Sequence, residues 1–184
     1  MDKINIEKSI KSNRLIYCST FSKIIEMIFM IALFGILIYT LTLDSFLKAE
    51  MNYIETLIIS AIVILAIALL NYGYIKNDEF HREKDILNNE NKLIIEKYLV
   101  QLTEQREWSF IKNSEQLKVM TIPMWQIQIG NYSKLYMIYD NDDLLLNFSS
   151  YALFGLKFPV NYFCNRKIEQ KIIQKIKTKI KNAP

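Results

Sequence analysis

Histidine, cysteine and glycine are scarce in this chain of 184 residues, which has one histidine, two cysteines and four glycines. A single histidine excludes a metal site built from several imidazoles. Two cysteines, Cys18 and Cys164, are too few for the disulfide framework of a small secreted domain. The isolated glycines provide no glycine-rich loop for phosphate binding. The sequence therefore predicts no cofactor and no enzymatic activity.

Basic residues are concentrated at the two ends of the chain. Residues 1–23 have five lysines and arginines against two acidic residues, and residues 164–184 have seven against one. The segment between them has 11 basic and 16 acidic residues, so it is net negative. Positive charge confined to the ends fits an anionic membrane surface better than nucleic acid. We therefore expect no nucleic-acid partner.

Two long apolar runs occupy most of the first half of the chain. Met27–Leu43 and Thr56–Ile75 contain 17 and 20 residues without a charge. A helix of roughly 20 apolar residues matches a hydrocarbon core of about 30 Å. The runs predict a two-helix transmembrane hairpin over residues 24–76, with the lipid bilayer as an integral contact.

Flanking charges predict the orientation of this hairpin, because lysine and arginine stay on the cytoplasmic side of a membrane. The basic segment 1–23 and the residues after the second run would both be cytoplasmic. Residues 77–91 are polar and charged, and we expect a linker or a helical extension there. His81 lies among acidic residues in this stretch, and a solvated segment is favoured over a metal site because no second histidine accompanies it.

Short segments rich in β-branched and aromatic residues follow from Lys92 and predict an antiparallel meander of about five to seven strands. A cluster of turn-forming residues, Asp140–Asp143, separates two of them. The predicted strands are Leu93–Leu102, Trp108–Ile111, Leu117–Ile122, Leu135–Tyr139 and Leu144–Phe148, with a further one over Tyr151–Leu156.

The last segment, Asn165–Lys181, predicts an amphipathic helix. Five isoleucines repeat at helical spacing and form one apolar stripe: Ile168, Ile172, Ile173, Ile176 and Ile180. The stripe could pack on the sheet or lie on a bilayer, and packing is favoured because an open apolar sheet face needs a cover. The other face carries Lys171, Lys175 and Lys179, which we expect to contact a partner or a membrane.

Three short motifs carry a resemblance to a known family. They are Ile122–Trp125, the hairpin Leu135–Phe148 and the phrase Phe158–Phe163, although Val160 stands where the family usually has a basic residue. In these motifs and in its layout the chain resembles the YcxB-like family of small bacterial membrane proteins. The resemblance implies a cytoplasmic domain of the pleckstrin-homology (PH) type over residues 92–184 and a two-pass location in the bacterial cytoplasmic membrane, with both termini cytoplasmic.

The fold class predicted from these patterns is an α+β membrane protein, in which the transmembrane hairpin precedes a PH-like antiparallel β domain closed by the C-terminal helix. Fold alone does not select an activity. We expect a non-enzymatic binding module that holds a protein partner at the inner face of the membrane, or that associates with itself.

Two other functions stay open alongside the binding module. One is a membrane protein that gives immunity to a bacteriocin or toxin, and the other is a small transporter or channel subunit, which uncharged spans disfavour. Trp125 and Tyr162 are candidate partner contacts, with core packing as the competing role.

Overall fold

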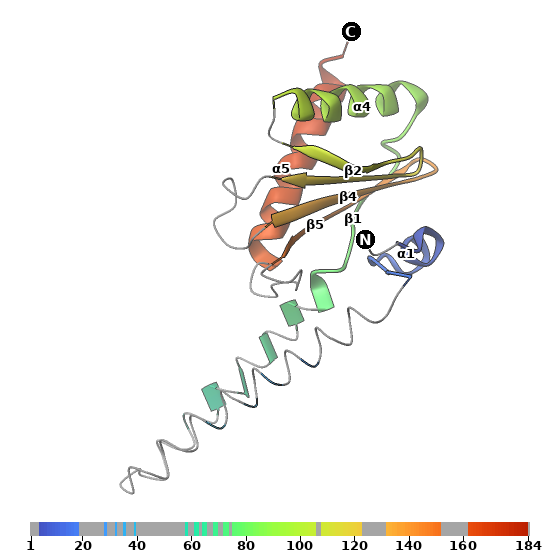
Figure 1. Ribbon diagram of the computed structural model, residues 1–184. Helices are drawn as coiled ribbons and strands as arrows, with labels where there is room; N and C mark the ends of the chain where they lie inside the picture. The colour runs from blue at the N-terminus through green and yellow to red at the C-terminus, as the bar shows by residue number, and fades with distance from the viewer. Residues whose placement is uncertain are drawn as a thin grey trace, which may run out of the picture.

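The computed structural model describes residues 4–18, 75–105, 108–122, 132–151 and 162–183, together with scattered positions between 28 and 73. Within these residues the chain forms an α+β fold (Figure 1). Its elements in chain order are α1 (Ile6–Ser12), β1 (His81–Glu83), α4 (Asn89–Glu104), β2 (Ser109–Asn113), β3 (Leu117–Ile122), β4 (Tyr132–Asp140), β5 (Asp143–Tyr151) and α5 (Tyr162–Lys181).

The five strands form one antiparallel sheet in the order β1-β5-β4-β3-β2. Strands β2 to β5 follow one another as a meander, and β1 joins the far edge beside β5. Asp140 pairs with Asp143 across a two-residue turn, in which Asn141 has a φ of 51°. Asparagine tolerates this left-handed conformation, so the predicted turn is confirmed.

The predicted strand at Leu93–Leu102 is wrong, because these residues lie within helix α4. Four apolar residues of the segment, Ile95, Tyr98, Leu99 and Leu102, are buried at helical spacing. The side chain of Asn88 caps the helix by accepting a hydrogen bond of 2.6 Å from the backbone N–H of Asn91. Cap and periodicity outweigh the β propensity of the isoleucines, because burial of one helical face stabilises the segment more than local preference.

Helices α4 and α5 cover one face of the sheet. The predicted C-terminal helix is confirmed, and Ile172, Ile173 and Ile176 of its stripe are buried against the sheet. The core on this face also includes Met120, Leu135, Met137, Leu146 and Phe148 from the strands. The stripe therefore packs on the sheet, as favoured from the sequence.

The N-terminal segment covers the opposite face of the sheet. Leu15 is fully buried there and packs in a second core with Phe80, Tyr136 and Ile138. Two backbone hydrogen bonds fasten the segment, from Leu15 N–H to the Asp78 carbonyl at 2.7 Å and from Phe80 N–H to the Asn13 carbonyl at 3.0 Å. The sheet is thus covered on both faces, and the segment expected to be a linker or helical extension contributes strand β1.

The membrane part of the fold prediction needs correction. Among the residues that the structure describes, no helix has both the length and the apolar character needed to cross a bilayer. Helix α4 has 16 residues, and α5, with 20, carries a lysine-rich face. The predicted transmembrane hairpin and two-pass location are overturned by this finding, although most of Met27–Leu43 and Thr56–Ile75 lies outside the described residues. The predicted PH-like membrane protein becomes an α+β fold with three helices and a five-stranded antiparallel sheet over the described part of the chain.

Candidate functional site

A groove of about 1000 Å³ lies between helices α4 and α5. Helix α4 and the residues just after it contribute one side, helix α5 contributes the other, and Trp108 lies between them before β2. The lining residues are Tyr98, Gln101, Leu102, Gln105, Trp108, Ile168, Lys171, Ile172, Gln174, Lys175, Thr178, Lys179 and Asn182. The groove is large enough for a segment of another chain, because its volume is at the upper end of the range for ligand sites.

The floor of the groove is apolar. Tyr98, Leu102 and Ile172 are largely buried there, since each also belongs to the core between the helices and the sheet. Trp108 and Ile168 are partly buried and pack against the same core. The Trp108 ring lies 6.5 Å from the Phe148 ring, which fixes it to strand β5. A rigid aromatic side chain in a partly open groove is a common anchor for protein partners.

The α5 side of the groove is basic. Lys171, Lys175 and Lys179 are exposed and line it together, and none of its described lining residues is acidic. Lys179 donates a hydrogen bond of 3.4 Å from Nζ to Gln101 Oε1, which joins the two helices across the groove. A positive wall beside an apolar floor favours an anionic, partly apolar ligand.

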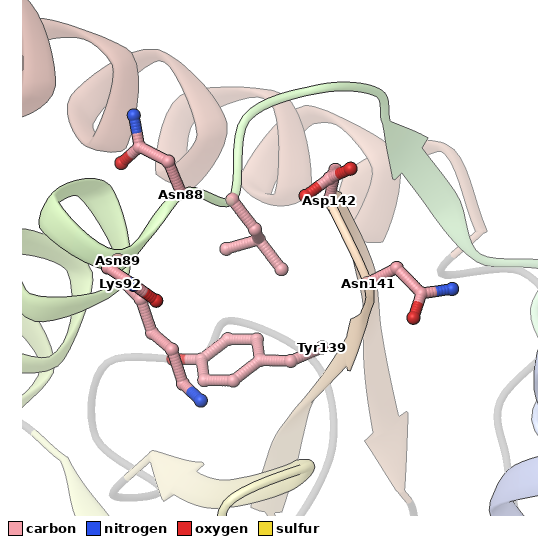
Figure 2. Close-up of a pocket in the computed structure, with 7 residues that line it drawn as sticks. Asn88, Asn89, Lys92, Tyr139, Asn141 and Asp142 are labelled. Carbon is pink, nitrogen blue, oxygen red and sulfur yellow. The ribbon is translucent and has the colours of Figure 1, made fainter.

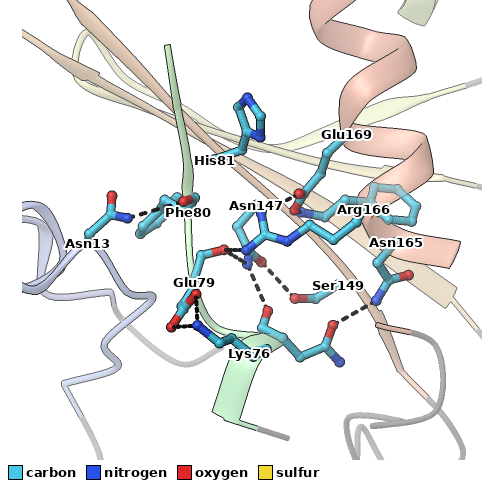
Figure 3. A network of polar contacts seen from close by, with 12 residues as sticks. Asn13, Lys76, Glu79, Phe80, His81, Asn147, Ser149, Asn165, Arg166 and Glu169 are labelled. Atoms are coloured by element: carbon cyan, nitrogen blue, oxygen red, sulfur yellow. Dashed lines mark hydrogen bonds and ion pairs between the residues drawn. The ribbon is translucent and has the colours of Figure 1, made fainter. Parts of the chain in front are cut away.

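Buried polar contacts hold the α5 wall against the sheet (Figure 3). Glu169, with only 1% of its surface exposed, accepts a hydrogen bond of 2.7 Å from the Phe148 backbone N–H. Its other oxygen contacts Arg166 Nη1 at 2.6 Å, and Arg166 also donates to the Glu79 carbonyl at 3.0 Å. Burial raises the pKa of Glu169, although Arg166 and the Phe148 N–H both favour its charged form.

Two buried asparagines extend this network. Asn147 donates to the carbonyls of Asn77 and Glu79 at 2.8 and 3.0 Å, and Asn165 donates to Asn77 Oδ1 at 2.9 Å. Ser150 donates to Asn165 Oδ1 at 2.8 Å. Strand β5, helix α5 and residues 77–79 are therefore joined by paired polar groups, which is the pattern of a structural network. Its consequence for the groove is that α5 is fixed in position.

A second, smaller pocket of about 490 Å³ lies where the start of α4 meets the β4–β5 turn (Figure 2). Lys92 and Asp142 line it on opposite sides, and Tyr139 forms part of its floor. The Tyr139 hydroxyl is buried without a hydrogen-bond partner, and burial raises the pKa of this tyrosine. The Lys92 ammonium lies 5.5 Å from the centre of the Tyr139 ring and makes a cation–π contact with that ring.

The structure brings three of the five candidate contact residues together. Lys171, Lys175 and Lys179 line the groove, whereas Tyr162 begins α5 away from it and contacts the Tyr72 and Phe163 rings at 5.9 and 5.2 Å. Trp125 lies outside the described residues. His81, considered as a metal ligand, is 3.0 Å from Glu83 Oε1.

The α4 side of the groove was not anticipated from the sequence. The sequence pattern predicts a strand for Tyr98 and Leu102, whereas both lie in α4, beside α5. The helical spacing of Ile95, Leu99 and Leu102 after a capping asparagine is the signal that identifies this wall.

The chain was compared with protein-family models, curated proteins and solved structures, and no match was found. The resemblance to the YcxB-like family stays a prediction that rests on three short motifs.

Proposed function

We propose that this protein is a non-enzymatic binding module, whose groove between α4 and α5 holds an acidic segment of a partner protein. The observation that carries the proposal is the row of Lys171, Lys175 and Lys179 beside an apolar floor. Apolar anchors supply affinity at such surfaces, and complementary charge adds specificity and a faster association.

The chemistry of the groove supports binding over catalysis. No carboxylate, imidazole or thiol occurs among its described lining residues, whose polar groups are amides, one threonine hydroxyl, one tyrosine hydroxyl, one indole N–H and three lysines. General acid–base catalysis usually relies on histidine or a carboxylate. The apolar floor also favours a protein ligand over nucleic acid, because nucleic-acid interfaces are more polar and are dominated by phosphate contacts.

Site-specific photo-crosslinking tests this proposal. A photoreactive amino acid replaces Gln174, an exposed residue of the groove, in the full-length chain expressed in cells. The matched control carries the same group at Lys8, an exposed residue of α1 on the opposite face of the sheet. We expect a protein to be crosslinked from position 174 and not from position 8, with the crosslinked peptide rich in aspartate and glutamate.

Charge reversal supplies the second arm of this experiment. In the variant K171E/K175E/K179E the crosslink from position 174 should fall at least about tenfold, because each lost ion pair becomes a repulsion. Substitutions at exposed positions change the free energy of unfolding little, so the variant should fold. A crosslink of undiminished yield, a neutral or basic partner segment, or a second copy of this chain as the product would contradict the proposal.

A further inference from the structure

The three groove lysines repeat every four residues along α5, at positions 171, 175 and 179. A helix rises about 1.5 Å per residue, so successive lysines are displaced by roughly 6 Å along its axis. Side chains four residues apart also lie close together on one side of a helix. The α5 wall therefore presents positive charge with a regular repeat of about 6 Å.

Two peptide conformations can place carboxylates at a similar repeat. A helix does so with acidic residues four positions apart, and an extended strand does so with acidic residues two positions apart, since two strand residues span about 6.6 Å. The charge repeat alone thus leaves both conformations open.

The walls of the groove distinguish a helical ligand from an extended one. An extended segment leaves its own N–H and C=O groups unpaired and usually binds to an open sheet edge. Among the residues that the structure describes, no strand residue lines this groove: its walls are helices α4 and α5 with Gln105 and Asn182 directly after them, and Trp108 lies before β2. The backbone groups within these helices are already bonded internally. A helical ligand brings its backbone hydrogen bonds with it and needs only side-chain contacts.

We infer that the segment bound in the groove is an amphipathic α-helix, with acidic residues every four positions facing Lys171, Lys175 and Lys179. Its apolar stripe packs on Tyr98, Leu102 and Trp108 at the groove floor. This inference rests on the proposed function and specifies the chemistry of the partner.

Three synthetic peptides test the inference that the bound segment is helical. Each has about 20 residues, a length at which an isolated helix can form in water. The first carries three glutamates at four-residue spacing beside a leucine stripe. The second has the same composition and stripe with the glutamates moved to other faces. The third keeps the order of the first but has two central prolines, which break the helix. Dissociation constants for the full-length protein are measured by isothermal titration calorimetry.

We expect the first peptide to bind on the order of tenfold more tightly than either control, as three exposed ion pairs allow. Equal binding of the first two peptides, or tighter binding of the third, would overturn the helix inference and leave the acidic-segment proposal standing. Failure of all three peptides to bind would also overturn the inference, and the crosslinking result would then decide the proposed function separately. A single-stranded oligonucleotide that bound more tightly than any peptide would overturn both.

A charge exchange provides the matched control. The variant K171E/K175E/K179E should lose its affinity for the first peptide. It should instead bind a version of that peptide in which the peptide's three glutamates are replaced by lysines. Recovery of affinity only with the matching repeat requires that the side chains at positions 171, 175 and 179 themselves contact the peptide. Recovery that is the same for a shuffled lysine peptide would contradict the inferred register.

Discussion

Replacing Glu169 with alanine should lower the free energy of unfolding by about 3 to 5 kcal/mol, the loss expected when one member of a buried ion pair is removed. Glu169 has two partners, Arg166 at 2.6 Å and the backbone N–H of Phe148 at 2.7 Å. Both lose the carboxylate in the alanine variant: Arg166 keeps its bond to the Glu79 carbonyl, and the Phe148 amide is buried in the core. Urea unfolding of the full-length chain measures this loss.

Glu169→Gln is the matched variant. Its amide oxygen can still accept a hydrogen bond from the Phe148 N–H, but the charge opposite Arg166 is gone. We expect a smaller loss of stability than in Glu169→Ala. If Glu169→Ala unfolded at the same urea concentration as the wild type, the network of Figure 3 would not be what fastens α5.

The pH dependence of stability gives this pair a second signature. The pKa of Glu169 is raised by burial above its ordinary value of 4.5. Between that value and the raised one the folded chain binds more protons than the unfolded chain, so stability falls as the pH rises through this window. Glu79 and Glu83, whose pKa values are lowered by ion pairs despite burial, act below 4.5 and in the opposite sense. The decline above pH 4.5 should be reduced in Glu169→Gln.

Replacing Leu15 with alanine should cost about 2 to 5 kcal/mol, the range for truncating a buried leucine. Leu15 is fully buried between the N-terminal segment and the sheet, where it packs with Phe80 and Ile138. The expected loss is large because the N-terminal segment packs on the sheet and shares a hydrophobic core with it. The midpoint of urea unfolding is again the measurement.

Lys11→Ala is the control, since Lys11 is an exposed residue of α1 in the same segment. Its replacement should change the free energy of unfolding by about 0.5 kcal/mol or less. Equal effects of the two substitutions would mean that the N-terminal segment does not belong to the cooperative fold.

Local patterns identified the sheet and the last helix well. Leu117–Ile122 forms β3 with the predicted bounds, and the turn at Asp140–Asp143 joins β4 to β5 as predicted. Both signals depend on short stretches in which alternation or turn chemistry is strong. The isoleucine stripe of α5 extends over about three turns, so its period is unambiguous.

The rest depends on contacts between distant parts of the chain. Leu93–Leu102 contains both β-branched residues and a helical repeat, and packing of Leu99 and Leu102 against α5 decides in favour of the helix. Leu15 lies in a polar, basic segment whose apolar residues show no clear period. Its place in the second core depends on pairing with residues 78–80, far along the chain.

The candidate groove also combines a feature that the local sequence determines with features that depend on long-range contacts. Its lysine row is visible in the sequence, because the spacing within one helix determines it. Its floor comes from α4, α5 and a residue before β2, so the sequence alone does not place Tyr98, Trp108 and Ile172 together. The transmembrane prediction depended on length and lack of charge alone, and no helix among the described residues combines the length and apolar character that crossing a bilayer requires.

Fluorescence of Trp108 reports whether the ligand occupies the groove. The chain has two tryptophans, so Trp125→Phe leaves Trp108 as the sole reporter on the groove floor. Titration with the helical acidic peptide should shift its emission to the blue as the ligand excludes water, and the added substitutions K171E/K175E/K179E should abolish the shift. An unchanged emission spectrum at a peptide concentration where calorimetry shows saturation would contradict the proposed binding site, because binding would then occur outside the groove.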